Sequence, residues 1–536
     1  MLARTHEPAE EQHTGRAATA PRYTWVFAAV GFALVCHQAL CKALLFRNLE
    51  YTGSDLYGIL DQTWSWLYAG RLLQDNAYGN QAAIHNYYLL PALSPFTIGL
   101  GAYGLFLAVA LLQLLAAMRL ASSRAVDTPG RVAAMAGLVS PVAFFALDDP
   151  VWGFHPELLY PPLAVLLALA LLERRRHQAL LVATLIVLVK EDGALVCGGV
   201  LAAHFTRQLW LARAAPRAER GRIARRAACA LGLAAAAFVL GLAVLWWVGH
   251  AASAEQATAG DRLGRSWRVL ARTLSPGAPE GRRAALLELL LAYAAGSVLL
   301  LLPLGARLAR GLLLLLVSAP PVVVVLVVSG AHYKFIDPLL AQRMATLLAV
   351  AVACVAIGGA AGAPQALARR FGWSAASSLL LAALSWALQL GLLARFGYSL
   401  QERADLRALW SGREYAVSSF TGEEVLFWRC VAGSLAGGTP VAPAAELLPF
   451  FHRQSIVFRR VEGRAPGRAR LRVFLAGTQR ASSPTGASCP GPRVRDLVLE
   501  ADCDLLPLLA PCGWSPAAPV GTGDQLAPVV PPPAQR

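Results

Sequence analysis

Apolar runs separated by short polar segments dominate the chain from residue 24 to residue 393. A helix that crosses a membrane needs about 20 predominantly apolar residues. We predict eleven crossings, with residues 178–205 counted as two. The others are residues 24–46, 99–118, 132–146, 158–172, 227–248, 284–303, 311–328, 344–360 and 374–393.

Residues 178–205 are predicted to be a hairpin because of the arginines on both flanks. Three arginines at positions 174–176 precede this segment, and seven between positions 207 and 226 follow it. Clustered basic residues in short loops stay on the cytoplasmic side, so the chain must leave that side and return. Lys190, Glu191 and Asp192 then lie at the tip. Because a charge at the bilayer centre costs about 2.5–3.5 kcal/mol, we expect these residues to cap the hairpin or line a wet cavity.

The composition supports this fold class. Hydrophobic residues make up 56% of the 536 residues, charged residues make up 15%, and the mean hydropathy is +0.50. A soluble core does not need so much apolar surface. The net charge of +16 comes largely from arginines in short loops, where it sets topology and does not indicate nucleic-acid binding. We predict an all-α polytopic protein of the cell membrane with about 11 transmembrane helices, a cytoplasmic N-terminus and an extracytoplasmic C-terminus.

The polar segments divide the chain further. We expect residues 1–23 to be a cytoplasmic disordered tail, and residues 24–398 to form the transmembrane domain with outer loops at 47–87 and 249–283. Residues 399–514 alternate strand-like and helix-like pieces and are predicted to form a small extracytoplasmic α+β domain. The proline-rich residues 515–536 are predicted to be a disordered tail.

The second outer loop contains an amphipathic pattern. Apolar residues recur at helical spacing in this loop, and arginines occupy the other faces. The apolar set is Leu263, Trp267, Leu270 and Leu274, and the basic set is Arg262, Arg265, Arg268 and Arg272. This pattern predicts a helix in the outer interface, with Trp and Leu in lipid and Arg on phosphates. The alternative is an ordinary solvated loop helix.

The nine cysteines fall into two groups. Five lie in apolar segments, where they are expected to be small buried hydrophobic residues. The other four are Cys430, Cys489, Cys503 and Cys512. If their region is extracytoplasmic, we expect one or two disulfides, and four cysteines allow three pairings.

Ionisable residues gather in four segments that the predicted topology places on the outer side. The segments are Asp55, Asp61 and His85; Asp148, Asp149, His155 and Glu157; Lys190, Glu191 and Asp192; and His332, Tyr333, Lys334 and Asp337. Carboxylates can deprotonate a hydroxyl or hold a divalent metal, and cationic groups can neutralise a phosphate leaving group. The structural alternative is that each residue caps a helix or forms an intramembrane ion pair.

Several of these motifs carry a family resemblance. They are Gly58-Ile-Leu-Asp61-Gln62, His85 before a proline-containing apolar run, Phe154-His155-Pro156-Glu157, Lys190-Glu191-Asp192, His332-Tyr333, and Leu447-Leu448-Pro449 followed by Arg453. Over roughly residues 45–460 the chain resembles the uncharacterised multi-pass membrane proteins called domain of unknown function 2079. It departs from their pattern in having Leu56-Tyr57 between Asp55 and Gly58, where a shorter spacing is expected. The resemblance therefore supports a functional role for Asp61 more directly than for Asp55. That family is similar in layout to C-type glycosyltransferases, although fold does not fix function.

The resemblance implies an inverting glycosyltransferase that takes a sugar from a polyprenyl-phosphate donor on the outer face of the membrane. Asp61 is expected to be the general base or a metal ligand, with Asp55 as its helper. Lys190 and His332, with arginines of the loop helix, are expected to hold the lipid phosphate. The other substrate-binding candidates are His85, His155, Glu157, Glu191, Asp192, Tyr333, Arg265 and Arg268.

Other classes remain open at this point. A divalent metal is a candidate cofactor, with Asp149, His155 and Glu157 as candidate ligands. Membrane lipids and a polyprenyl-phosphate-linked substrate are the expected partners, and no nucleic acid is expected. The alternative function is a transporter or lipid flippase in which the same charges line a substrate pathway. A structural or assembly role would leave the charged segments unexplained.

Overall fold

A computed structural model describes most of the helical part of the chain and portions of the C-terminal part. The described residues are 23–47, 51, 54–68, 70, 72–75, 79–149, 152–251, 259–332, 341–360, 374–398, 406–407, 422–435, 439–442, 447, 450, 455–456, 470–475, 488–494 and 497–513. Both predicted terminal tails fall almost wholly outside these residues.

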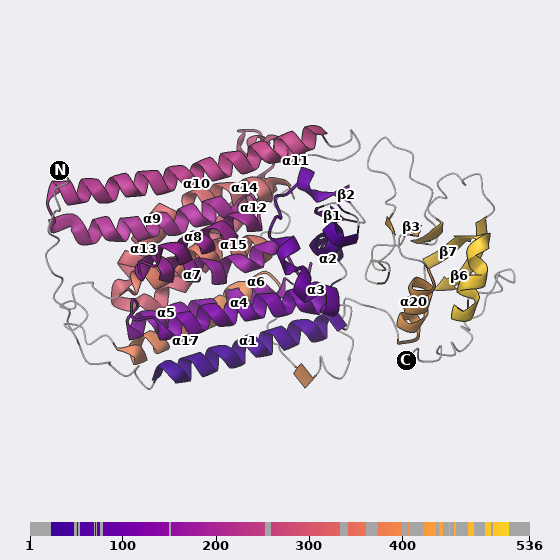
Figure 1. Ribbon diagram of the computed structural model, residues 1–536, viewed down its shortest axis with the longest axis horizontal. Coiled ribbons are helices and arrows are strands. Elements are labelled where there is room, and N and C mark those ends of the chain that lie inside the picture. Colours follow the sequence, from indigo (N-terminus) through magenta and orange to yellow (C-terminus); the bar gives the residue numbers. More distant parts are fainter. Residues whose placement is uncertain are drawn as a thin grey trace, which may run out of the picture.

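Helices form the larger body of the protein (Figure 1). They are α1 (Tyr23–Arg47), α2 (Ser54–Tyr68), α3 (Ser94–Leu100), α4 (Ala102–Ser122), α5 (Thr128–Leu138), α6 (Pro141–Asp148), α7 (Tyr160–Leu172), α8 (Arg176–Val189), α9 (Gly193–Leu211), α10 (Arg217–Ala251), α11 (Ala259–Leu274), α12 (Glu280–Leu301), α13 (Leu308–Ser318), α14 (Pro320–His332), α15 (Ala341–Gly358) and α17 (Ala375–Arg395). Prolines at the first turns of α6, α7 and α14 mark the breaks between consecutive helices, because proline is tolerated there and not in a helix interior.

Six stretches among the described helices are long and apolar enough to cross a membrane. They are Ala29–Arg47, Ala102–Ser122, Thr128–Asp148, Arg217–Val248, Glu280–Ser318 and Ala375–Arg395. Shorter apolar helices run beside them, among them Pro156–Leu172, Arg176–Val189, Pro320–Ala331 and Arg343–Gly358. The chain is therefore a helical polytopic protein, and the count of eleven crossings stays a prediction.

Helix α15 is the centre of the bundle. Every side chain from position 344 to position 357 is buried, and the helix packs against α5, α6, α7, α9, α12 and α13. Small residues permit this close packing. Where α5 meets the end of α15, a Cβ added to Gly130 would overlap the backbone of Gly359. Both positions therefore need glycine for this approach.

Contacts between distant residues define two ends of the bundle. At one end Lys42 of α1, Asp148 of α6 and Tyr398, which follows α17, are joined by hydrogen bonds. At the other end Arg307 bridges Asp127, before α5, and the Gly359 carbonyl after α15. We call these the Asp148 end and the Asp127 end. The arginines at 174–176, in the turn before α8, and at 207–226, in the end of α9, the connection to α10 and its first turns, belong to the Asp127 end. The Arg119–Glu173 ion pair at 2.8 Å lies at the same end.

The first predicted outer loop is not only a loop. Residues 54–68 form helix α2, and a short two-stranded ribbon, β1 (Gln74–Asp75) and β2 (Gly79–Asn80), follows it. In Figure 1 these elements lie with α3 at the right-hand end of the bundle. The polar composition concealed the helix, because it buries polar as well as apolar residues. Asp61, Gln62 and Thr63 are as buried as Leu56, Ile59 and Leu60.

Helix α11 confirms the predicted helix of the second outer loop and corrects one of its residues. Leu263, Trp267 and Leu274 are exposed, in agreement with a face turned to lipid. Leu270 was expected on that face but is 8% exposed, because the helix packs on α14 with its adjacent face. The helix therefore has a protein-facing side as well as an exposed apolar side.

The C-terminal part contains a five-stranded sheet with a hydrophobic cluster of its own. The strands are β3 (Pro440–Ala442), β4 (Ser455–Ile456), β5 (Leu471–Leu475), β6 (Ser488–Val494) and β7 (Leu497–Asp502), in the order β4-β3-β5-β7-β6. Strand β3 pairs in parallel with β4 and β5, and the pairs β5–β7 and β7–β6 are antiparallel. Trp428 of helix α20 (Gly422–Ser434) is fully buried in the cluster. The boundaries 399–514 stay a prediction.

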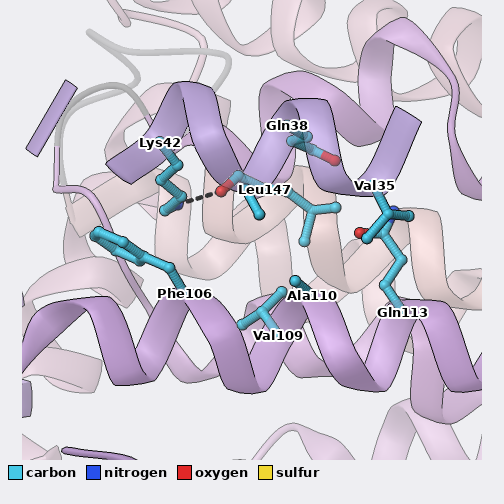
Figure 2. Close-up of a pocket in the computed structure, with 9 residues that line it drawn as sticks. Val35, Gln38, Lys42, Phe106, Val109, Ala110, Gln113 and Leu147 are labelled. Carbon is cyan, nitrogen blue, oxygen red and sulfur yellow. Dashed lines mark hydrogen bonds between the residues drawn. The ribbon is translucent and has the colours of Figure 1, made fainter. Parts of the chain in front are cut away.

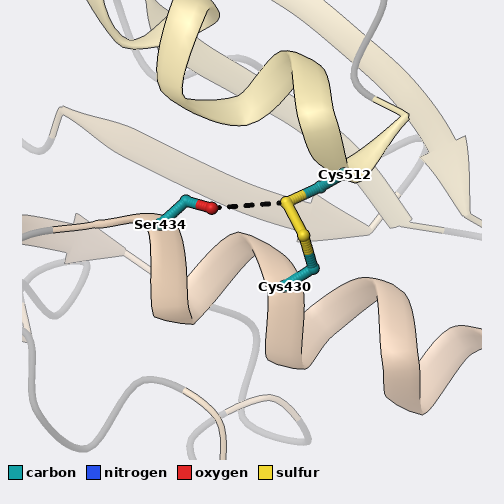
Figure 3. Close-up of a disulfide and its surroundings, with 3 residues drawn as sticks. All are labelled: Cys430, Ser434 and Cys512. Atoms are coloured by element: carbon teal, nitrogen blue, oxygen red, sulfur yellow. Dashed lines mark hydrogen bonds between the residues drawn. A yellow bond between two sulfur atoms is a disulfide. The ribbon is translucent and has the colours of Figure 1, made fainter. Parts of the chain in front are cut away.

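Two disulfides join the elements of this part. Cys430 of α20 pairs with Cys512, and Cys489 of β6 pairs with Cys503. Figure 3 shows Cys430 and Cys512 with Ser434, whose hydroxyl lies 3.4 Å from the Cys512 sulfur. Of the three pairings that the sequence allows, the structure selects this one.

Candidate functional site

The hairpin predicted for residues 178–205 is present as α8 and α9, with a tight tip. Helix α8 ends at Val189, and Lys190 has extended backbone angles, φ −166° and ψ 168°. Helix α9 begins directly after Asp192 at Gly193, where a Cβ would overlap the Ile186 carbonyl oxygen. Three consecutive ionisable residues are therefore forced into one short turn between two apolar helices.

Each ionisable residue of the tip has a partner on a different segment. The Lys190 ammonium lies 2.5 Å from Glu157 Oε1, in the segment that leads into α7. Glu191 lies 2.9 Å from His85 Nδ1 and accepts the Asn86 backbone N–H at 3.2 Å. The Tyr160 hydroxyl donates to Asp192 Oδ1 at 2.5 Å. We call this set, Glu157, Lys190, Glu191, Asp192, His85 and Tyr160, the hairpin-tip cluster.

The hairpin-tip cluster is rich in acid. Three carboxyl groups face one ammonium and one imidazole, so the ionised cluster is negative when His85 is neutral. Glu157 is 1% exposed, and its second carboxylate oxygen, Oε2, has no hydrogen-bond partner among the described groups. A buried polar atom of this kind needs an explanation, because nearly all such atoms in folded proteins are paired.

Asp149 is a second buried carboxyl group with an oxygen that has no hydrogen-bond partner among the described groups. Asp149 directly follows α6 and lies in the left-handed region, φ 45° and ψ 67°, which Asp tolerates better than most residues. Its Oδ2 lies 2.7 Å from His155 Nδ1, and within the described part of the chain its Oδ1 has no hydrogen-bond partner. His155 and Asp149 are both buried. Asp149 and Glu157 thus flank His155 in sequence, and each keeps one unsatisfied acceptor.

Asp148 is held by residues that sequence reasoning did not assign to the site. The Tyr51 hydroxyl donates to Asp148 Oδ1 at 2.7 Å, and the Tyr398 hydroxyl donates to Oδ2 at 3.1 Å. Lys42 donates to the carbonyls of Leu147 and Asp148, the free carbonyls at the end of α6. The position of Lys42 near the end of an apolar run could have identified it as a candidate site residue. Nothing in the local pattern marked the tyrosines.

Helix α10 locates the hairpin-tip cluster along the bundle. The Asn86 side-chain amide, next to His85, donates to the Gly241 carbonyl of α10 at 2.9 Å. At 1.5 Å per residue, Gly241 lies about 22 Å from Arg226 and about 9 Å from Trp247 along the helix. Trp246 and Trp247 are exposed near the Asp148 end of α10, as in an aromatic belt. The cluster is therefore inside the apolar length of the bundle, nearer to the Asp148 end.

The remaining predicted residues are only partly placed. Asp61 lies in α2 and is 5% exposed. Arg265 and Arg268 are exposed on α11. Asp55 lies in α2 and His332 ends α14, but their side chains are outside the described residues, and Tyr333 lies wholly outside them.

The candidate metal ligands Asp149, His155 and Glu157 stay candidates. Among the described residues, no group of three or more His, Cys, Asp or Glu side chains is placed to hold a metal ion. Asp149 and His155 contact each other, whereas Glu157 pairs with Lys190. The three candidate ligands are therefore engaged in two separate interactions.

A recess between α1 and α4 lies beside this end of α6. Figure 2 shows Lys42 and Gln38 on α1 facing Phe106, Val109 and Gln113 on α4, with Leu147 between the helices. The Lys42 ammonium lies 5.2 Å from the centre of the Phe106 ring and 5.7 Å from that of Tyr51. The recess is mainly apolar, and the Lys42 ammonium is at the end nearest Asp148.

Comparisons with known proteins add no relative. No family model matches the chain, and no curated protein or solved structure matches it. The resemblance drawn from the motifs therefore stays an expectation, and the function must be argued from the geometry above.

Proposed function

We propose that this protein is a membrane glycosyltransferase that transfers a sugar from a polyprenyl-phosphate donor to an acceptor hydroxyl at the Asp148 end. One observation carries the proposal: two buried carboxylates, Asp149 and Glu157, each keep an oxygen without a donor. A polyhydroxyl ligand supplies O–H donors to both. Carboxylates that accept hydrogen bonds from hydroxyl groups are also suited to remove a proton from one of them.

The Asp148 end is proposed to face outside. Arginine-rich turns mark the Asp127 end, and short loops of this kind stay in the cytoplasm. The disulfides of the C-terminal part agree with this orientation, because disulfides persist in oxidising compartments. Helix α17 leads into that part from the Asp148 end, since Tyr398 contacts Asp148.

The donor phosphate is proposed to bind at α11. Arg265 and Arg268 are exposed on this helix, whose other exposed face carries Leu263, Trp267 and Leu274. Such a helix holds a lipid phosphate at the interface while its apolar face contacts the chain of the lipid. The resemblance assigns Lys190 to the phosphate, but Lys190 pairs with Glu157, and we propose that it orients that carboxylate.

In the proposed reaction an acceptor oxygen attacks C1 of the sugar, and the bond between C1 and the phosphate oxygen breaks. The acceptor proton passes to Asp61, and the polyprenyl phosphate leaves with its negative charge next to the arginines of α11. Glu157 and Asp149 hold hydroxyl groups of the reacting sugars.

The transporter alternative is favoured by a different observation. The hairpin-tip cluster lies inside the apolar length of α10 and its charges pair with one another, as in ion-coupled transport pathways. A transporter must expose these residues to both sides in turn, whereas the transferase needs access from one side only.

The test uses purified full-length protein in sealed vesicles with a panel of polyprenyl-phosphate sugars. The proposal predicts donor consumption and release of polyprenyl phosphate when acceptor is added on the side of the C-terminal part. Movement of intact donor or free sugar across the membrane without cleavage would favour the transporter. No consumption of any donor, by protein that is folded and correctly oriented, would contradict the transferase.

A further inference from the structure

The hairpin-tip cluster is partly open to a ligand. The side chains of His85, Glu191 and Lys190 are 23%, 17% and 17% exposed. Glu157 contacts Lys190, and Asn86 contacts Glu191 through its backbone N–H, but both of these residues are buried. A ligand that passes the three partly exposed side chains therefore meets the buried polar groups of Glu157 and Asn86.

Carboxyl groups outnumber positive charges in this part of the protein. The carboxyl groups of the hairpin-tip cluster and of the adjoining segment at the end of α6 are those of Asp148, Asp149, Glu157, Glu191 and Asp192. Their neighbours that carry or can acquire a positive charge, among the described residues, are Lys42, Lys190, His85 and His155. Five carboxylates face four positive charges when both imidazoles are protonated, and two when both are neutral. An excess negative charge inside an apolar bundle is costly, so a cationic ligand is favoured there.

The Asn86 amide leaves its carbonyl oxygen without a donor. Its Nδ2 donates to the Gly241 carbonyl at 2.9 Å, which fixes the orientation of the amide, because a flipped amide would set two oxygens against each other. Gly241 permits this approach, since an added Cβ would lie 3.2 Å from Asn86 Nδ2. Asn86 Oδ1 and Glu157 Oε2 are both buried and have no hydrogen-bond partner among the described groups. Two buried acceptors at the hairpin tip therefore need donors from a ligand.

A protonated amine supplies both the donors and the charge. An ammonium group has three N–H donors and one positive charge, whereas a hydroxyl group has one donor and no charge. Hydrogen bonds between an ammonium and a carboxylate are about twice as strong as neutral ones. Tyr88 adds a further attraction, because its side chain is partly exposed, it is an electrostatic neighbour of Glu191, and cations bind to aromatic rings.

We propose that the hairpin-tip cluster binds a sugar that carries a protonated amino group. The ammonium donates to Glu157 Oε2 and supplies the missing positive charge, and a hydroxyl group of the same sugar donates to Asn86 Oδ1. This inference rests on the proposed function and names its substrate class: the acceptor is an amino sugar, and the group that Glu157 holds is its ammonium.

The test compares the binding of three sugars to purified full-length protein in detergent, by isothermal titration calorimetry at matched ionic strength. The sugars are protonated glucosamine, N-acetylglucosamine and glucose, of which only the first is charged. We expect glucosamine to bind at least about tenfold more tightly than either neutral sugar. Equal affinities of the three sugars would overturn the proposal.

A substitution that changes only charge locates the amine. Asp192→Asn removes one negative charge from the cluster and keeps an acceptor for the Tyr160 hydroxyl. It should reduce the preference for glucosamine by about tenfold and leave glucose binding within about twofold of wild type. Glu173→Gln removes the same charge at the Asp127 end and should keep the full preference. A full preference in folded Asp192→Asn would overturn the proposal, and if this variant does not fold, the comparison of sugars on the wild type decides it.

The Asn86 contact has its own variant. Asn86→Ala should weaken the binding of all three sugars to a similar extent, because it removes an acceptor for a hydroxyl group and no charge. Unchanged binding of all three sugars by folded Asn86→Ala would contradict this contact.

Failure of this inference and failure of the transferase proposal give different results. Donor consumption with neutral acceptors and no preference for glucosamine would keep the transferase and overturn the amine site. Tight glucosamine binding by protein that consumes no donor would keep the amine site and contradict the transferase.

Discussion

Lys190 and Glu157 form a 2.5 Å ion pair that ties the tip of the α8–α9 hairpin to the segment leading into α7. Their side chains are only 17% and 2% exposed. The pair therefore connects the ionisable segment that contains Glu157 to the one that contains Lys190. The Glu157 oxygen that has no hydrogen-bond partner, Oε2, is on the carboxylate of this pair.

Replacing Lys190 with Met should destabilise the protein by about 3–5 kcal/mol, because Glu157 is left as an uncompensated buried charge. The measurement is the unfolding free energy of purified protein in a fixed detergent. Lys190→Met combined with Glu157→Gln should recover most of the loss, since no charge is then unpaired. If the double variant loses the sum of the two single losses, the pair does not act as a unit.

The packing of Tyr51 on Gly153 should also be sensitive to substitution. Gly153 has φ +80°, and an added Cβ would lie 2.7 Å from the Tyr51 ring. Gly153→Ala should therefore cost about 1–3 kcal/mol, through backbone strain and displacement of Tyr51 from Asp148. The control is Gly232→Ala on α10, where nothing lies within 4 Å of the added Cβ. Similar unfolding temperatures for the two variants would contradict this packing.

The sequence was sufficient for features that depend on apolar length and on arginine position. The hairpin followed from arginines on both flanks of one apolar stretch, and α11 followed from the spacing of Leu263 and Trp267. Helix α2 was missed because its buried side contributes few apolar residues to a polar loop. The two surfaces of α11 could not be separated either, since Leu270 and Leu274 share one stripe in the sequence and only packing on α14 distinguishes them.

The site itself could be predicted only as a set of segments. The ionisable segments include Glu157, Lys190 and Asp149, but the partners of these residues depend on tertiary contacts between distant positions. Tyr398 contacts Asp148 although the two residues are 250 positions apart in the sequence. The local sequence around either residue does not predict the other as its partner. The predicted roles for Asp61, Arg265 and Arg268 stay predictions, because geometry places these residues without assigning them a ligand.

The disulfide pairing gives a prediction about the C-terminal part. Cys430→Ser should free Cys512 for thiol labelling while Cys489 and Cys503 stay protected. The chain-entropy relation gives a loss of about 4.5 kcal/mol for the Cys430–Cys512 bond, which closes the longer loop, and about 3 kcal/mol for Cys489–Cys503. Peptide mapping without reduction checks the pairing. A peptide that joins Cys430 to Cys489 or Cys503 would contradict it.

The proposed orientation makes a prediction of its own. A reporter that is active only outside the cytoplasm should work when fused after Arg395, at the end of α17, and should be silent when fused at Arg220 in α10. A reporter that is active only in the cytoplasm should give the reverse result. If the first reporter is active when fused at Arg220, the four ionisable segments do not share the outer side of the membrane. That result would contradict the proposed transferase site.

The most direct test of the transferase account is the rate of donor consumption by four proteins in one assay: wild type, Asp61→Asn, Glu157→Gln and Glu173→Gln. Glu173 is a matched control, because it is a carboxylate with arginine partners at the Asp127 end. Asp61→Asn should lower the rate by about 10²–10⁴-fold, as expected for loss of a general base. Glu157→Gln should raise KM for the acceptor, and Glu173→Gln should transfer sugar at the wild-type rate. Wild-type rates in folded Asp61→Asn and Glu157→Gln would contradict the assignment of the site.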